Sequence, residues 1–192
     1  MRPVRHVLSV FCVWVCIAVS RAQAVDQDPA GCPVGRGATP FQLAFAAQVQ
    51  MLPDTWDVMG LRVDLVAGCN RNVSGLDLGL LNESDGWEYG LQVGGLWNDV
   101  HGSMAGLQVA GLVNTTGAKD RCQGLQVAGA NLGGATDGVQ IGVFNEAAGG
   151  MTGVQIGLVN ISDRPLMGMQ IGLINLDEGG PVPFMPIMNF GF

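Results

Sequence analysis

Apolar and polar residues follow an eight-residue phrase that recurs along most of the chain, approximately Gly-Leu-Gln-Val-Gly-Leu-Val-Asn. With the leading glycine as position 0, positions 1, 3, 5 and 6 are apolar, position 2 is glutamine, and asparagine ends the phrase. Clear copies begin at Gly90, Gly106, Gly124, Gly138, Gly153 and Gly168, and two degenerate copies begin at Gly60 and Gly75. Short alternation rich in β-branched residues predicts one β-strand per copy and no helix.

The glutamine position recurs at a nearly constant interval. Its occupants are Arg62, Asp77, Gln92, Gln108, Gln126, Gln140, Gln155 and Gln170, so the steps are 15, 15, 16, 18, 14, 15 and 15 residues. A fixed short period indicates a repeat architecture, in which each unit buries its apolar face only against its neighbours. In the copies at Gly90, Gly106 and Gly124 we expect one extra residue before the end of the phrase.

Two all-β architectures fit one strand per unit. In a parallel β-solenoid each unit is one coil, and equivalent residues stack about 4.8 Å apart. Three walls would then carry positions 1 and 3, position 6, and the apolar residue two places before the glycine, with glycines near the corners. In the alternative, an antiparallel outer-membrane-type barrel of about ten strands, alternate units run up and down.

The amide positions favour the solenoid, because identical amides hydrogen-bond to one another only up a parallel stack. Arg62 and Asp77 head the glutamine column and are expected to form an ion pair. The apolar alternation of a copy is also shorter than the ~9–11 residues of a tilted membrane strand. Polar connectors and the C-terminal Phe192 favour the barrel instead. The predicted structural ladder consists of Gln92, Gln108, Gln126, Gln140, Gln155, Gln170, Asn82, Asn98, Asn114, Asn145, Asn160 and Asn175.

The N-terminus has the features of a secretory signal peptide. Basic residues precede an apolar run from Val7 to Ser20, and Ala22-Gln23-Ala24 has the small-x-small form of a cleavage site. The predicted location is therefore extracytoplasmic. The expected organisation is a signal peptide over residues 1–24, a mobile leader over 25–39, an N-terminal strand and cap over 40–59, the eight-unit array over 60–178, and a C-terminal capping segment over 179–192.

Composition excludes several classes of function. A net charge of -7 with only nine Lys and Arg argues against binding nucleic acid or anionic lipid by electrostatics. No metalloprotease, serine-hydrolase or phosphate-loop sequence occurs, and no catalytic, cofactor-binding or metal-ligating residue and no cofactor is expected. His101 is expected in an exposed turn. A hydrolase would instead require Asp64, Asp77 and a third carboxylate to converge in a groove.

Three cysteines follow the predicted cleavage site, Cys32, Cys69 and Cys122. Export permits a disulfide, but the odd number leaves at least one thiol over, and the sequence does not decide whether any pair forms. Cys122 occupies the apolar position two places before a glycine, so it is expected to be a small buried hydrophobic residue.

The repeat, together with its ending Pro183-Phe184-Met185-Pro186, resembles bacterial exported surface-repeat proteins built of Gly-Leu-Gln-x-Gly-Leu-x-Asn units, known from spirochaetes and other Gram-negative groups. This uncharacterised family implies an exported, non-enzymatic protein with a structural or interaction role at a Gram-negative cell envelope. Its repetitive face is expected to present regularly spaced amides to a surface, protein or envelope partner, and no nucleic acid. The alternative is a small integral outer-membrane barrel with a pore or scaffold role.

Overall fold

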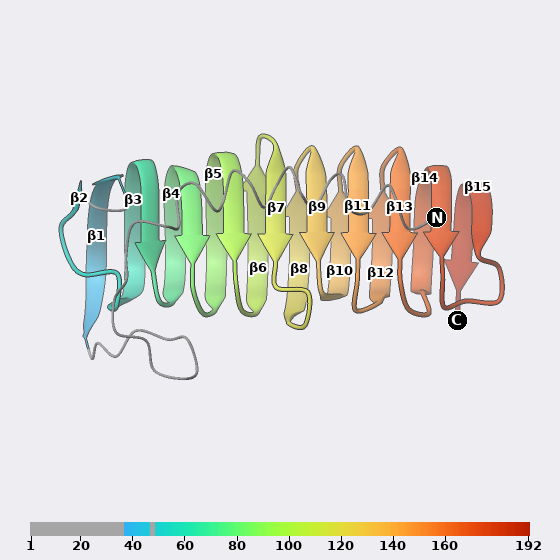
Figure 1. Cartoon of the computed structure of the whole chain (residues 1–192), viewed down its shortest axis with the longest axis horizontal. Coiled ribbons are helices and arrows are strands. Elements are labelled where there is room, and N and C mark those ends of the chain that lie inside the picture. Colours follow the sequence, from blue (N-terminus) through green and yellow to red (C-terminus); the bar gives the residue numbers. More distant parts are fainter. Residues whose placement is uncertain (1–36, 47–48) are drawn as a thin grey trace. The chain divides into compact units, whose positions relative to one another are not determined.

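The computed structural model describes residues 37–46 and 49–192, which belong to one compact unit, Gly35–Phe192. The expected signal peptide and the leader up to residue 36 lie outside the described residues. The unit is a parallel β-solenoid of about nine turns with a repeat of about 15 residues (Figure 1). The prediction of an all-β solenoid is therefore confirmed.

The described part of the chain contains fifteen strands. They are β1 (Ala38–Ala46), β2 (Val49–Gln50), β3 (Asp57–Asn70), β4 (Val73–Ser84), β5 (Glu88–Val100), β6 (Met104–Ala110), β7 (Val113–Thr116), β8 (Arg121–Val127), β9 (Ala130–Gly133), β10 (Ala135–Ile141), β11 (Phe144–Ala147), β12 (Met151–Ile156), β13 (Val159–Ser162), β14 (Met167–Asp177) and β15 (Phe184–Gly191).

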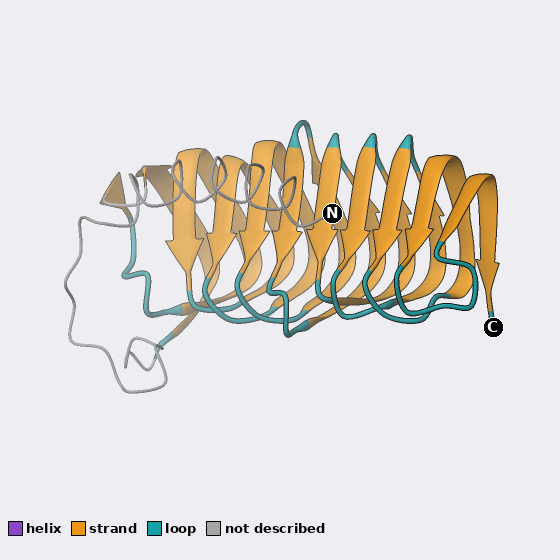
Figure 2. Ribbon diagram, turned by 45° about the vertical axis from the view of Figure 1, so that its right-hand side comes forward, coloured by secondary structure: helices purple, strands orange, loops and turns teal. Residues whose placement is uncertain are grey.

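Each repeat coil has two strand segments separated by a bend (Figure 2). The glycine–glutamine segments pair with one another to form what we call the first wall, and the asparagine segments form the second wall. A turn, not a predicted third wall, completes the coil. Neighbouring copies run parallel and in register, as in the pairing of Gln140 with both Gln126 and Gln155. The antiparallel barrel alternative is therefore wrong.

Antiparallel strands close both ends of the stack. At the first end β1 forms an additional coil, in which Gln42 pairs with Arg62, and β2 pairs antiparallel with β1. At the other end β15 runs antiparallel to β14 along both walls, with Gln170 opposite Asn189 and Leu176 opposite Phe184. β15 covers the edge of the last coil, on which a further strand could otherwise add, and β2 covers the end of β1.

The interior of the coil is largely polar. Four columns of side chains point inward: the glutamine column, the asparagine column, a column of small residues two places after the asparagine, and the column two places before the glycine. Only the last is mainly apolar. It includes Cys122, which is fully buried as expected, has a free thiol and packs with Val100 and Met104.

The apolar side chains at positions 1, 3, 5 and 6 point outward, so the expectation that positions 1 and 3 fill one wall of the coil and position 6 the next is wrong. Successive residues of a strand face opposite sides. Because the glutamine at position 2 faces inward, its apolar neighbours at positions 1 and 3 must face outward. The interior accepts the glutamine because, as shown below, every amide in the column has a hydrogen-bonding partner.

The leading glycines permit close stacking of the coils. In each copy this glycine has a positive φ, between 120° and 151°, which L-residues rarely adopt. A Cβ atom on Gly138 would lie 2.0 Å from the carbonyl oxygen of Gly124 in the preceding coil. The glycine column therefore lies within the first wall and marks tight backbone contact between coils.

Candidate functional site

The predicted glutamines lie in one buried column in which each amide donates to the one before it. Gln108 Nε2 donates to Gln92 Oε1 at 2.8 Å, and the same distance separates each later pair as far as Gln170 and Gln155. The second amide proton is also used, since Gln155 Nε2 reaches the carbonyl oxygen of Ile161 at 3.2 Å. The column thus joins the first wall to the second.

The asparagines form a second column with the opposite direction of donation. Asn82 Nδ2 donates to Asn98 Oδ1 at 2.9 Å, and the series continues to Asn175. Asn131 belongs to this column although it was not among the predicted ladder residues. The copy at Gly124 has no extra residue, so its asparagine stands seven places after the glycine, and that spacing could have identified it.

Both columns are inaccessible to a partner. Gln92, Gln108 and Gln126 have no exposed surface, and the asparagines are buried to the same degree. The expectation that the repeat presents amides outward is therefore wrong. Buried amides that hydrogen-bond to one another stabilise the fold and specify the register of the coils, but they do not recognise a ligand.

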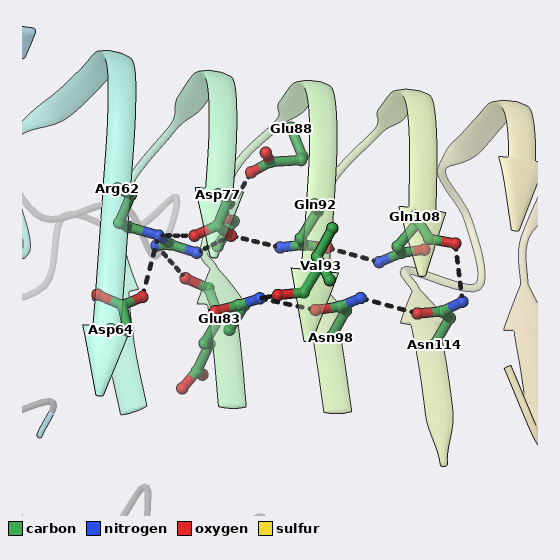
Figure 3. A network of polar contacts seen from close by, with 12 residues as sticks. Arg62, Asp64, Asp77, Glu83, Glu88, Gln92, Val93, Asn98, Gln108 and Asn114 are labelled. Carbon is green, nitrogen blue, oxygen red and sulfur yellow. Dashed lines mark hydrogen bonds and ion pairs between the residues drawn. The ribbon is translucent and has the colours of Figure 1, made fainter. Parts of the chain in front are cut away.

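The glutamine column begins at a buried ion pair (Figure 3). Arg62 lies above Asp77, with Nε–Oδ1 and Nη2–Oδ2 distances of 2.7 and 2.5 Å, and both side chains are fully buried. Asp77 Oδ2 also accepts a hydrogen bond from Gln92 Nε2 at 3.0 Å. A carboxylate suits this place, because the column needs an acceptor at its first end and Arg62 needs a counter-charge.

Two further carboxyl groups adjoin this pair. Asp64 Oδ2 lies 3.3 Å from Arg62 Nε, and Glu88 accepts a hydrogen bond from Ser84 Oγ at 3.0 Å. Burial raises the pKa of Asp64 to about 7 and the pKa of Glu88 to about 8. If both hold protons, Arg62 and Asp77 remain as a neutral pair. Three carboxyl groups therefore converge, as a hydrolase would require, but within the closed core.

Apolar rows run along the outer surface of both walls on either side of the bend. No charged residue occupies positions 1, 3, 5 or 6 in any copy. The row at the bend is the most exposed, with exposed fractions of 58% for Leu112, 52% for Leu158 and 65% for Leu173. Single exposed apolar residues are ordinary, but continuous apolar rows of this length indicate an interaction surface. We call positions 1, 3, 5 and 6 of all coils the apolar face.

A shallow groove of about 770 Å³ lies on the apolar face of the last coils. Position 4 there is Ala128, Gly142, Gly157 or Gly172, and these small residues leave a depression between the larger side chains of positions 3 and 5. The larger side chains that border it are Val127, Ile141, Ile156, Ile171, Val143, Leu158 and Leu173, with Ile187 of β15 at its end.

The turns form the charged side of the solenoid. Arg71, Asp85, His101, Lys119 and Arg164 all lie in turns or bends. The described part of the molecule is therefore amphipathic about its axis, with a charged turn edge and an apolar face. Within residues 37–46 and 49–192, no helix has the length and apolar character needed to traverse a bilayer.

No family model, curated protein or solved structure matches this chain.

One cluster of ligand-type side chains was missed by the sequence patterns. His101 is half-exposed in a turn, as expected, but its ring lies beside Glu83, Asp85 and Asp99. Alignment of the copies could have revealed the cluster, because Cys69, Glu83 and Asp99 each follow the asparagine position in three consecutive copies.

Proposed function

We propose that this protein is an exported, non-enzymatic component of a Gram-negative cell envelope, and that its apolar face binds the lipid surface of a membrane. The supporting observation is the reversal of the usual pattern: the amides fill the interior and the aliphatic rows cover the exterior. In this arrangement the solenoid lies along the membrane with its charged turn edge in water, as an interfacial amphipathic helix does.

The direction of the backbone hydrogen bonds suits a lipid environment. Unpaired N–H and C=O groups are costly in hydrocarbon. In the solenoid, the backbone N–H and C=O groups of each coil pair with those of the neighbouring coils along the axis, as in the pairings of β10 with β8 and β12. The apolar face can therefore lose water without leaving backbone groups unpaired.

A lipid surface fits the chemistry of the apolar face better than a protein does. Protein interfaces carry about one hydrogen bond per 100–200 Å² and are enriched in aromatic residues and arginine. Positions 1, 3, 5 and 6 are almost entirely aliphatic, and Trp97 is the only tryptophan among them. Since the chain has a net charge of -7, binding is expected to depend on apolar contact and not on anionic headgroups.

Flotation of the mature protein, residues 25–192, with uncharged phosphatidylcholine vesicles tests this function. The protein is expected to float with the vesicles, and to do so equally well in about 1 M salt, where surface charges are screened. The double variant Leu158→Asp/Leu173→Asp is expected to remain at the bottom of the gradient. The matched control adds the same charge at two exposed positions outside the apolar face, with Ala118→Asp in a turn and Thr152→Asp near the start of β12.

Two outcomes would overturn the lipid proposal. The first is a folded wild-type protein that does not float. The second is flotation of the Leu158→Asp/Leu173→Asp variant at the wild-type level. If the wild-type protein instead forms a dimer that this variant dissociates, and the dimer ignores vesicles, a second copy of the chain is the partner.

A further inference from the structure

Cys69, Glu83, Asp85, Asp99 and His101 lie together where the second wall meets the turn edge. Cys69 pairs in register with Glu83, and Glu83 pairs with Asp99, so their side chains form a row on the outside of three consecutive coils. Asp85 begins the turn that follows β4, and His101 begins the turn that follows β5. Their backbone N–H groups donate to the carbonyl oxygens of Asn70 and Ser84, which holds the two turns side by side.

The donor atoms of Cys69, Glu83 and Asp85 lie close enough together to share one metal ion, and the imidazole of His101 adjoins two of them. The ligand atoms of Cys69, Glu83 and Asp85 all lie within 4.8 Å of one another. Cys69 Sγ is 3.8 Å from Asp85 Oδ2, and His101 Nδ1 is 3.5 Å from Asp85 Oδ1 and 3.9 Å from Glu83 Oε1. Donors in a tetrahedral zinc site, at bond lengths of 2.0–2.3 Å, lie roughly 3.3–3.8 Å apart.

We propose that Cys69, Glu83, Asp85 and His101 form a binding site for a divalent transition-metal ion of the zinc type. A thiolate, an imidazole nitrogen and carboxylate oxygens are the donors that Zn²⁺ takes in proteins. Calcium and magnesium use oxygen ligands alone, so the thiol and imidazole distinguish this site from theirs.

Asp99 supports the arrangement from the far side of the imidazole. His101 Nε2 lies 3.7 Å from Asp99 Oδ2, while Nδ1 faces Glu83 and Asp85. Asp99 is itself held by the hydroxyl of Thr115, which accepts a hydrogen bond from Trp97 Nε1 at 3.3 Å. A carboxylate that orients a histidine for a metal is a recurrent feature of zinc sites, where it fixes the tautomer of the ring.

The surroundings favour a cation at this place. The carboxyl groups of Glu83, Asp85 and Asp99 lie around the single imidazole of His101, so negative charge is in excess here, and a divalent ion would neutralise it.

Titration of the reduced mature protein, residues 25–192, with Co²⁺, a spectroscopic substitute for Zn²⁺, tests the site. Thiolate ligation is expected to produce a sulfur-to-cobalt charge-transfer band that Zn²⁺ abolishes by displacement. Cys69→Ser is expected to remove the band, whereas Cys122→Ser, which alters a thiol buried in the core, is expected to retain it. Cys32→Ser is expected to retain the band as well.

A second measurement does not depend on the thiol. Asp85 contacts both Cys69 and His101, so Asp85→Asn is expected to weaken Zn²⁺ binding by more than the about 10–100-fold that an outer-shell partner contributes. Asp120→Asn, in another turn, serves as the control. The proposal is overturned if the wild type shows no thiolate band, if Cys32→Ser and not Cys69→Ser removes it, or if Asp85→Asn binds Zn²⁺ like the wild type.

Discussion

The carboxyl group of Asp64 occupies the space that Gly68 leaves in the asparagine column. Gly68 pairs in register with Asn82, so it stands where the later coils carry an asparagine. A Cβ atom on Gly68 would lie 2.0 Å from Asp64 Cγ. Asp64 in turn stands where the next two coils carry Gly79 and Gly94. The large and the small residue have exchanged places, and the interior remains filled.

This exchange predicts a strong coupling between the two positions. Gly68→Asn alone is expected to lower the free energy of unfolding by at least about 1–3 kcal/mol, because the new side chain overlaps Asp64. Asp64→Gly alone leaves a cavity. The double variant Asp64→Gly/Gly68→Asn recreates the arrangement of Gly79 and Asn82. Its free energy of unfolding is therefore expected to be higher, by about 0.5–3 kcal/mol, than the sum of the two single effects would give. Urea unfolding measures all four proteins, and additive effects would contradict the interpretation.

The buried ion pair predicts opposite results for a single and a double substitution. Arg62→Gln leaves Asp77 buried without its guanidinium and is expected to destabilise the protein by about 3–5 kcal/mol. Arg62→Gln/Asp77→Gln extends the amide column without a break from Gln42 to Gln92, and replacing a buried ion pair is often neutral or stabilising. Urea unfolding at about pH 5, where Asp64 and Glu88 are expected to be neutral, compares the two. A double variant less stable than Arg62→Gln would refute this explanation.

The middle of the glutamine column is expected to be sensitive to loss of one amide. Gln140 donates to Gln126 and accepts from Gln155, in both cases at 2.8 Å. Gln140→Leu leaves the side-chain oxygen Oε1 of Gln126 without this donor, which is expected to lower the free energy of unfolding by about 1–3 kcal/mol, as for other buried polar groups. Gln123→Leu, at an exposed position of the adjacent coil, is expected to change stability by less than about 0.5 kcal/mol. Equal effects in thermal unfolding would argue against a stabilising column.

Stability is expected to fall as the pH rises through neutrality. Burial raises the pKa of Asp64 to about 7 and of Glu88 to about 8, whereas the unfolded values are about 3.9 and 4.3. Between these limits the folded state binds more protons, so each group lowers the free energy of unfolding by up to about 1.4 kcal/mol per pH unit. Their stabilising contribution is complete below about pH 4.

The matched variants Asp64→Asn and Glu88→Gln isolate this effect. Each is expected to flatten the decline in unfolding free energy between about pH 5 and pH 8. Denaturant unfolding at a series of pH values measures the slopes. A wild-type curve that rises over this range, or variants with unchanged slopes, would show that the two carboxyl groups are ionised in the core.

The repeat pattern also predicted much of the candidate site's framework. Identical residues at a constant interval required parallel neighbours, because only a parallel stack brings like amides together. The same reasoning placed Arg62 above Asp77. It missed Gln42, because β1 lacks the leading glycine of the repeat, and Pro40 stands there instead.

By itself, the sequence determined the period, the strand in each copy and the residues that stack on one another. Only the tertiary structure decided which side of each strand faces inward. An alternation with a period of two is the same whether the apolar residues or the glutamine face inward, and only closure of the coil distinguishes the two. Closure also brought Cys69 beside Asp85 across a turn. Such contacts depend on how the coils are stacked, so they cannot be predicted from the residue spacing within a single copy.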